Sequence, residues 1–424
     1  MARITAIERQ KAIYVGGLGG RRPVVPAHPD RLAAQARKCM SAEAWAYVAG
    51  GAGLEQTIET NRQAFAQWRI IPRMLRDVSE RDTTVELFGR QLPAPMLLAP
   101  IGVLELAHRE ADLAVARAAA RLDIPMIFSN QASVPMEACA HAMGDGPRWF
   151  QLYWSKSDEL VASFVQRAER CGCEAIVVTL DTTMLGWRLR DIDLAYLPFL
   201  EGLGIAQYTS DPVFRQLIES PPPADGLELK PPRNLTTIRK VLRLMRRYPG
   251  GFWHNLRSGR PLRAVRTFIQ TYSRPSLTWD DLARLRGMTR LPIVLKGILH
   301  SGDARKAVEC GVDGIIVSNH GGRQVDGALA SLEALPAVVQ AVEGRIPVLL
   351  DSGIRTGADI YKALALGATA VLIGRPYVYG LAIAGEQGVA EVLRNFMADF
   401  ELTMGLAGCR NVREIRQERL LRVS

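Results

Sequence analysis

Eight strand-length apolar runs, which alternate with amphipathic segments of helical spacing, constrain the fold of this chain more than any other feature. The runs are rich in Val, Ile and Leu and hydrophobic almost throughout, as is typical of parallel strands buried on both faces. They span residues 94–101, 125–130, 149–154, 175–181, 292–297, 314–320, 347–353 and 370–376. Eight such βα units predict an α/β fold, a closed TIM (β/α)8 barrel, with a doubly wound open sheet as the alternative.

Two segments fall outside the eightfold pattern. Residues 1–92 are expected to form a mainly helical N-terminal extension, in which 30–50 is the clearest helix, and the barrel then spans 93–424. Residues 192–276, between the fourth and fifth strands, are far longer than an ordinary βα connection and contain Pro221-Pro222-Pro223 and Pro231-Pro232. A long insertion at the C-terminal end of a barrel strand is expected to act as an active-site lid.

The positive charge of the chain is a local feature. Residues 230–274 hold twelve Lys or Arg and no Asp or Glu; removing them from the net charge of +10 leaves −2 for the rest. No aromatic-interleaved platform or nucleic-acid motif accompanies these charges, which argues against nucleic-acid binding. The apolar runs are too short to span a membrane, the start lacks a signal peptide, and the six scattered cysteines fit reduced thiols. These observations predict a cytoplasmic globular protein.

Polar residues gather at the ends of the strands, where barrel active sites form. They are Ser129, Gln151, Tyr153, Thr179, Asp181, Lys296, Ser318, His320, Asp351 and Arg375. Because positions inside a barrel should be apolar, this clustering predicts one convergent polar pocket. No metal-ligand spacing is visible: Cys171-Gly172-Cys173 is too close for a usual zinc pair.

The last two units have the composition of a phosphate site. Asp351-Ser352-Gly353-Ile-Arg355-Thr-Gly357 follows the seventh strand, and Ile373-Gly374-Arg375-Pro376 follows the eighth. Glycines let the backbone approach a ligand closely, and arginines supply charge-assisted donors. Phosphates in TIM barrels bind at these two strand ends, so the two segments together predict a phosphate-bearing ligand.

The segment after the sixth strand carries the clearest candidate base. In Ser318-Asn-His320-Gly-Gly-Arg323-Gln324, the histidine titrates near neutrality, and the arginine offers a planar fork suited to a carboxylate. His320 is the only histidine set among glycines and an arginine at a predicted barrel mouth. Asp181, at the end of the fourth strand, is placed to stabilise its protonated form.

This Ser-Asn-His-Gly-Gly-Arg-Gln run resembles the signature of the FMN-dependent α-hydroxy acid oxidases and dehydrogenases. The resemblance extends over nearly the whole chain. It includes Tyr47-Val-Ala-Gly-Gly, Ala99-Pro-Ile-Gly102, Trp149-Phe-Gln-Leu-Tyr153, Thr179-Leu-Asp181-Thr, Leu295-Lys296-Gly297 and Leu350-Asp-Ser-Gly-Ile-Arg355. It implies FMN as cofactor, a small 2-hydroxy acid as substrate, oxygen or a quinone as acceptor, and a homotetramer.

The resemblance also implies roles for individual residues. His320 would be the active-site base, assisted by Asp181. Arg323 and Arg188 would grip the substrate carboxylate, and Tyr47 and Tyr153 would hydrogen-bond the substrate. Lys296 would stabilise the reduced flavin near N1. The flavin ring would be lined by Pro100, Ile101, Gly102, Ser129, Gln151, Thr179 and Ser318; Asp351 and Ser352 would contact the ribityl region, and Gly353, Arg355, Gly374 and Arg375 the phosphate.

Within the family, the chain most resembles lactate 2-monooxygenase, and this resemblance favours L-lactate as the substrate. Gly102 stands where many members have alanine, and Leu197-Pro-Phe-Leu-Glu-Gly-Leu-Gly and Asp211-Pro-Val-Phe also fit that subgroup. A missing methyl beside the ring opens space that could alter how oxygen or retained product meets the reduced flavin. A tolerated glycine without effect on oxygen chemistry is the alternative.

The basic stretch 230–274 departs from that subgroup. Residues 235–248 are expected to form a helix with Ile238, Leu242 and Met245 on one side and arginines around the rest, followed by Phe252-Trp253. Such a segment can lie on an anionic membrane, which favours a peripheral, quinone-linked dehydrogenase as the alternative function. A solvated lid or an oligomer contact is the simpler interpretation. A phosphate-binding barrel isomerase without flavin is the remaining alternative.

Overall fold

Eight parallel strands close into a barrel in the computed structural model, which describes residues 5–219, 232, 234–418 and 420–423. The barrel closes because the last strand pairs with the first, with Leu372 opposite Leu97. The strands are β4 (Met96–Leu98), β5 (Met126–Phe128), β6 (Arg148–Leu152), β7 (Ile176–Thr179), β8 (Ile293–Ile298), β9 (Gly314–Val317), β10 (Val348–Leu350) and β11 (Ala370–Ile373). Each strand lies within or overlaps its apolar run, and the ends of strand and run differ by up to three residues. The TIM barrel is therefore confirmed, and the open-sheet alternative is wrong.

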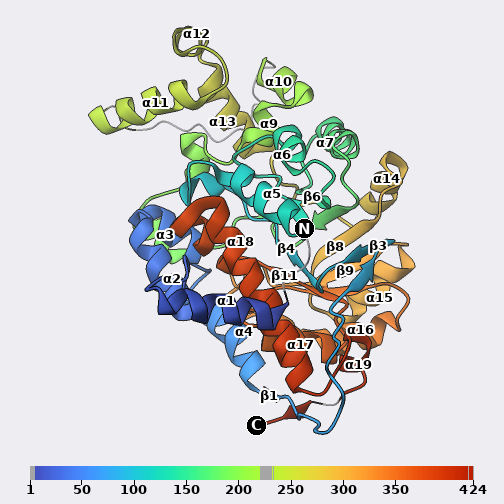
Figure 1. The fold of residues 1–424 in the computed structure, drawn as a ribbon. Helices are drawn as coiled ribbons and strands as arrows, with labels where there is room; N and C mark the ends of the chain where they lie inside the picture. The colour runs from blue at the N-terminus through green and yellow to red at the C-terminus, as the bar shows by residue number, and fades with distance from the viewer. Residues whose placement is uncertain (1–4, 220–231, 233, 419, 424) are drawn as a thin grey trace.

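Helices surround the barrel and bury its outer face (Figure 1). They are α5 (Ala111–Arg121), α6 (Met136–Met143), α7 (Asp158–Arg170), α14 (Asp281–Met288), α15 (Ser301–Glu309), α16 (Ser331–Val342), α17 (Gly357–Ala365) and α18 (Arg375–Leu406), with the single turns η1 (Leu104–Leu106) and α19 (Val412–Ile415). Alternate strand residues fill the interior, and the hairpin of β2 (Val85–Leu87) and β3 (Arg90–Leu92) closes one end, where Phe88 packs on Trp149. The interior is thus a packed core, and ligands are left to the other end.

The N-terminal extension contains four helices that lie beside the barrel. They are α1 (Ala6–Leu18), α2 (Pro29–Cys39), α3 (Ala42–Ala49) and α4 (Gln56–Ala66); α1 and α2 pack on α18, and β1 (Trp68–Arg69) pairs with β12 (Leu421–Arg422). The single helix expected over 30–50 is wrong. Met40 is extended, and the Ser41 hydroxyl accepts the Ala44 N–H, so a new helix begins there. This break turns α3 so that its C-terminal end meets the barrel mouth.

The insertion after β7 is helical. It comprises α8 (Leu189–Asp193), η2 (Pro198–Glu201), α9 (Ala206–Thr209), α10 (Pro212–Glu219), α11 (Leu235–Arg247), α12 (Phe252–Ser258) and α13 (Arg260–Thr271). The helix expected over 235–248 is confirmed as α11, whereas Pro221-Pro222-Pro223 and Pro231 lie outside the described residues. In Figure 1, α11 and α12 project from the body, and α13 leads back to it. Within the described part of the chain, no helix is long and apolar enough to cross a bilayer.

Candidate active site

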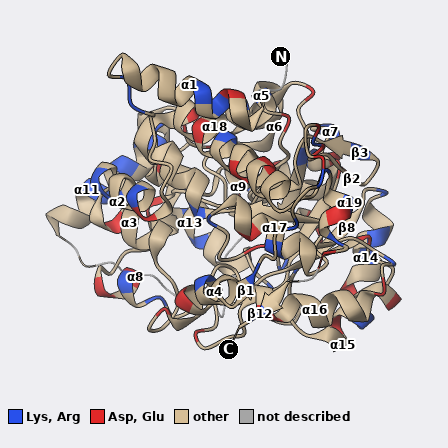
Figure 2. Ribbon diagram, turned by 60° about the horizontal axis from the view of Figure 1, so that its bottom comes forward, with Lys and Arg blue, Asp and Glu red and all other residues tan. Residues whose placement is uncertain are grey.

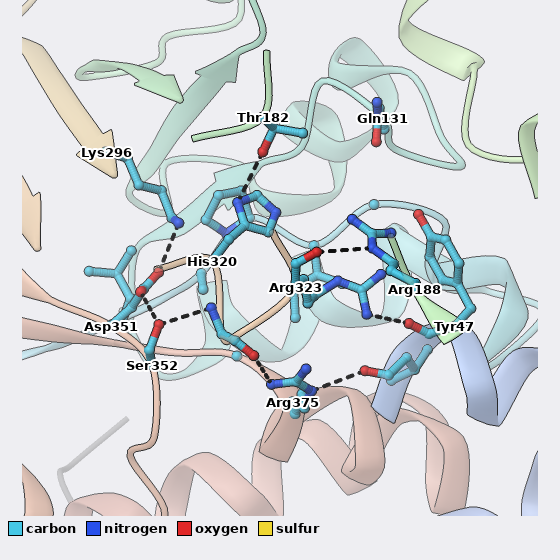
Figure 3. A pocket seen from close by; sticks show the side chains of 18 of the residues that line it. Tyr47, Gln131, Thr182, Arg188, Lys296, His320, Arg323, Asp351, Ser352 and Arg375 are labelled. Atoms are coloured by element: carbon cyan, nitrogen blue, oxygen red, sulfur yellow. Dashed lines mark hydrogen bonds and ion pairs between the residues drawn. The ribbon is translucent and has the colours of Figure 1, made fainter. Parts of the chain in front are cut away.

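A cavity opens at the C-terminal ends of the strands, and most of the predicted site residues line it (Figure 3). The space between its lining residues, counted out to the open mouth and into the adjoining solvent, is about 1080 Å³. The predicted residues that line it are Tyr47, Pro100, Ile101, Gly102, Tyr153, Arg188, Lys296, His320, Arg323, Asp351, Ser352, Gly353, Arg355, Gly374 and Arg375. Elements far apart in sequence, from α3 to α18, therefore meet at one site.

The other predicted residues lie directly behind this lining. The Gln151 side chain accepts a hydrogen bond from the Ser129 hydroxyl (3.1 Å) and donates one to the Thr179 hydroxyl (3.0 Å). The Ser318 hydroxyl accepts a hydrogen bond from the Lys296 ammonium at 2.8 Å, and the Asp181 carboxylate contacts the His320 ring. These buried groups hold one another, so they fix the floor of the cavity and its first layer of side chains.

His320 and Asp181 form a hydrogen-bonded pair at the cavity. Nδ1 of His320 lies 2.7 Å from Oδ1 of Asp181, and the Thr182 hydroxyl donates to the same carboxylate oxygen at 3.0 Å. Burial alone would raise the pKa of Asp181, but His320 and Lys296 lower it to about 2, so it is ionised at neutral pH. The Nδ1–H of His320 then donates to Asp181, which leaves Nε2 without a proton. Burial also lowers the pKa of His320, so the imidazole is neutral at pH 7 and its Nε2 is free of a proton.

His320 adopts a left-handed backbone conformation, with φ of 57°. This conformation is rare for residues other than glycine and costs backbone energy, and it is typical of functional sites. Its N–H donates to the Ser318 hydroxyl at 3.0 Å, and the neighbouring Gly321 N–H donates to the Ser352 hydroxyl at 3.0 Å. The ends of β9 and β10 thus hold the ring in place.

Lys296 provides a buried positive charge on the floor of the cavity. Its ammonium lies 3.0 Å from Oδ2 of Asp351. Burial would lower the pKa of Lys296, but Asp351 and Asp181 raise it above its usual value, so the side chain stays charged. The Ser352 hydroxyl donates to the other oxygen of Asp351 at 2.7 Å, which orients the carboxylate.

Two arginines face the cavity beside Tyr47. The Arg323 guanidinium lies 5.0 Å from the centre of the Tyr47 ring, and that of Arg188 lies 5.9 Å from it on a cation–π contact. Burial, together with Arg188, lowers the pKa of Arg323 to about 9. Within the described part of the chain, neither arginine forms an ion pair with a carboxylate; their hydrogen bonds go to carbonyl and amide oxygens. The pair is therefore ready for an anion, and a carboxylate fits its geometry.

A second pair of arginines, Arg355 and Arg375, forms a candidate anion position at the ends of β10 and β11. Burial lowers the pKa of Arg355 to about 10 and also lowers that of Arg375, and among the described residues neither pairs with a carboxylate. Gly374 precedes the first turn of α18 and leaves its N-terminal N–H groups without a side-chain cap. A methyl at Gly353 would lie 2.4 Å from the Asn61 carbonyl oxygen, so only glycine fits there. Half-buried guanidiniums, a helix N-terminus without a side-chain cap and glycines fit the phosphate of a cofactor.

Several residues that line the cavity were not among those predicted from the sequence. Gln131, Thr182, Leu185, Phe199 and Tyr272 line it, and Tyr272 comes from the end of α13 in the insertion. Thr182 directly follows Asp181, so its position was a usable signal. Phe199 and Tyr272 carry no such signal, because only the folded insertion brings them over the barrel mouth.

The fold and the cavity define a class of protein, the barrel enzymes that hold an anionic cofactor at the ends of their last two strands. Comparison with known proteins gives the family. Residues 36–422 match the model of the FMN-dependent dehydrogenase family. The chain belongs to this family, and FMN is its cofactor. The flavin-free isomerase considered from the sequence is therefore wrong.

Relatives with established names agree. The chain is 41% identical to FMN-dependent alpha-hydroxy acid dehydrogenase qulF of Penicillium citrinum, over 98% of this chain and 96% of the relative. It is 42% identical to L-lactate oxidase of Lysinibacillus sphaericus, over 87% and 86% respectively. Among solved structures, mandelate oxidase with (S)-4-hydroxymandelic acid matches with a TM-score of 0.77 and 36% identity, over 93% of this chain and 99% of that chain. FMN-dependent oxidation of an α-hydroxy acid is the activity these relatives share.

Proposed function

We propose that the protein oxidises a small L-2-hydroxy acid, L-lactate foremost, with oxygen as electron acceptor. The observation that carries the proposal is the cavity lined by His320, which pairs with Asp181, and by Arg188 and Arg323, which have no carboxylate partner among the described residues. A base and a carboxylate grip that line the same cavity suit a substrate that carries a hydroxyl next to its carboxylate. Tyr272, Phe199 and Leu185 line the same cavity, and we infer that they limit the substrate to a short side chain.

The side chains can then divide the work. Arg323 and Arg188 hold the substrate carboxylate and fix its orientation, which removes much of the entropic barrier. His320 takes the hydroxyl proton at Nε2, and Asp181 stabilises the imidazolium that forms. Burial raises the pKa of Tyr153, so this side chain keeps its phenolic proton. It can donate a hydrogen bond to the substrate, as can Tyr47. FMN, when bound, supplies the two-electron acceptor, and Lys296 places a positive charge on the cavity floor where negative charge develops.

Substrate choice can be tested by anaerobic reduction of the flavin. In stopped flow with L-lactate, glycolate, longer 2-hydroxy acids and L-mandelate, we expect L-lactate to bleach the flavin band fastest. Tyr272→Ala removes one wall of the cavity, so we expect the ratio of rates for mandelate over lactate to rise about tenfold. Equal rates for both acids in the two proteins would contradict the proposed size limit. No reduction by any of these acids would contradict the proposed function.

Gly102 bears on the fate of the product. A methyl at this position would lie 2.8 Å from the Gln131 carbonyl oxygen and 3.0 Å from its Cβ, so alanine must push the 131 segment, which itself lines the cavity. The open space that the sequence suggested beside Gly102 is therefore absent, and the glycine instead allows the close approach of the Gln131 segment. We propose that this placement of Gln131 in the cavity lining retains the 2-oxo acid beside hydrogen peroxide, which oxidises it to the shorter acid, carbon dioxide and water, as in a monooxygenase.

Gly102→Ala tests this retention. Under air with L-lactate, we expect the wild type to form mainly acetate and the variant to release pyruvate and hydrogen peroxide in several-fold greater proportion. Gly287→Ala is the matched control, because a methyl there meets nothing within 4 Å. Identical product mixtures in wild type and Gly102→Ala would leave the glycine without a role in oxygen chemistry.

One surface favours a second candidate function, a peripheral-membrane dehydrogenase that passes electrons to a quinone. The projecting helices α11 and α12, here called the arm, expose Leu235 (73%), Ile238 (55%), Trp253 (71%) and Leu256 (43%). Six basic residues lie among them: Arg239, Lys240, Arg243, Arg246, Arg247 and Arg257. The sequence predicted an apolar side on α11, and only part of that side is exposed to solvent. Met245 is buried, whereas Ile238 is exposed.

The charge of the arm contrasts with the rest of the molecule. Positive and negative residues are interspersed over the barrel and its helices (Figure 2), whereas the described residues of the arm include no Asp or Glu. Exposed apolar side chains, a tryptophan and an unbalanced basic face match a helix that lies in the interface of an anionic bilayer. The homotetramer and the cytoplasmic location, like this membrane contact, remain predictions.

Liposome flotation tests the arm. We expect the protein to float with vesicles that contain phosphatidylglycerol at low salt, and to be released at high salt or with neutral vesicles. Replacing Leu235, Ile238 and Trp253 with serine should reduce the bound fraction severalfold. Tyr14→Ser with Leu18→Ser is the control, since these side chains are equally exposed but lie on α1. Absence of salt-sensitive binding would exclude the membrane contact.

A further inference from the structure

The C-terminal turn of α3 connects the two anion positions of the cavity. The last carbonyls of a helix have no partner within the helix and carry partial negative charge. Here two arginines of the barrel supply those partners. Arg323 Nη1 donates to the Tyr47 carbonyl at 2.5 Å and to the Gly50 carbonyl at 2.9 Å. Arg375 donates from Nε to the Val48 carbonyl at 3.1 Å and from Nη2 to the Gly50 carbonyl at 2.9 Å.

The third guanidinium nitrogen of Arg375 also donates a hydrogen bond to the backbone. Its Nη1 donates to the Gly321 carbonyl at 2.9 Å, directly after His320. A methyl at Gly321 would lie 2.9 Å from that nitrogen, so the guanidinium packs tightly against this glycine. The neighbouring strand-end loop joins the same assembly, because the Ala52 N–H donates to the Gly322 carbonyl at 2.9 Å. Figure 3 shows Arg375 below Arg323, with interactions on two sides of its guanidinium, and Arg323 beside Tyr47.

Arg355 differs from Arg375 in this respect. Among the residues that the structure describes, its guanidinium donates to one carbonyl, that of Ile354 in its own segment, at 2.8 Å. Both side chains line the cavity, and both are half-buried. Arg355 therefore keeps most of its N–H donors for a ligand, whereas all three nitrogens of Arg375 already hold the chain. The sequence suggested that both arginines bind the phosphate. These contacts leave Arg355 freer to do so than Arg375.

We propose that Arg375 is a positioning residue for the substrate carboxylate, and that it acts through the carbonyls at the end of α3. The Gly50 carbonyl accepts from both arginines, so Arg375 fixes the turn against which Arg323 and Tyr47 are set. The inference rests on the proposed function in one respect, the role of Arg323 as carboxylate grip. It adds that an arginine at the phosphate position of the cofactor also sets the affinity for substrate.

Charge-conserving variants separate the two roles. In Arg375→Lys, one ammonium cannot reach three carbonyls in different directions, whereas the positive charge remains. With FMN at saturation, we expect the Kd of pyruvate, followed by the shift of the flavin absorbance, to rise about tenfold. In the matched control Arg355→Lys we expect the Kd of pyruvate to change less than about threefold, and the Kd of FMN to rise about tenfold.

The outcomes distinguish this inference from the proposed function. An unchanged Kd of pyruvate in Arg375→Lys, or an equal loss in Arg355→Lys, overturns the positioning role of Arg375. If the wild type binds no 2-oxo or 2-hydroxy acid, or if Arg323→Lys leaves the Kd of pyruvate unchanged, the proposed carboxylate grip fails instead. Amide hydrogen exchange adds a readout independent of ligands: the Gly50 and Ala52 N–H groups should lose protection in Arg375→Lys and keep it in Arg355→Lys. Should the lysine variants not fold, Arg375→Gln and Arg355→Gln replace them in both measurements.

Discussion

Replacing His320 with asparagine is expected to lower kcat for L-lactate by about 10⁴-fold while the protein keeps its FMN. The loss follows from the removal of Nε2, the one unprotonated nitrogen that the Asp181 contact leaves facing the cavity. Asparagine is the appropriate replacement because residue 320 has a φ of 57°, a left-handed conformation that asparagine tolerates better than most residues. Stopped-flow reduction under anaerobic conditions measures the effect on the step that needs the base.

His141→Gln is the control, since this histidine is exposed on α6 and lies away from the cavity lining. The wild type should also lose activity toward acid pH. Burial lowers the pKa of His320 below its usual value, so kcat/KM should rise with pH as His320 loses its proton, and the midpoint of this acid limb should lie below about pH 6.5. A midpoint above about pH 6.5, or a variant with near wild-type kcat, would show that another group takes the proton.

The architecture could be predicted from sequence because its signal is local. Each barrel strand is an apolar run buried on both faces, and parallel closure then follows from the alternation with helices. Strand ends share one edge of a barrel, which is why the order of runs along the chain was enough to assign residues as distant as Gln151 and Arg375 to one region. The N-terminal extension was harder. Helical spacing over 30–50 hid the stop at Met40, although Ser41 offered a capping signal.

The rest of the site depends on contacts that no local pattern encodes. Tyr272 reaches the cavity because the Thr271 carbonyl accepts from the Ser155 hydroxyl and the Lys156 N–H, which pins the end of α13 to the loop after β6. Arg375 binds backbone carbonyls of α3, and a carbonyl looks the same in every residue of a sequence. Composition could therefore indicate which charges gather at the mouth, but only the fold decides which of them are left for a ligand.

Asp181→Asn is expected to lower kcat by about 10³-fold with a smaller change in KM. Asp181 accepts from His320 and from Thr182, and its pKa of about 2 keeps it ionised throughout the working range. The asparagine keeps the shape but removes the negative charge, so the imidazolium formed on proton transfer loses its partner. An asparagine amide can also donate to Nδ1, which would favour the tautomer with its proton on the wrong nitrogen.

The sign of the pH effect follows from the same contact. Asp181 raises the pKa of His320 against the lowering by burial, so its loss should lower that pKa further. The acid limb of kcat/KM should then move to lower pH while the plateau falls, which separates loss of base strength from loss of folding. Asp303→Asn, in the exposed first turn of α15, is the control for a surface carboxylate. An acid limb that stays in place would mean that the group titrating in that limb is not His320, because a charge 2.7 Å from the imidazole cannot be removed without changing its proton affinity.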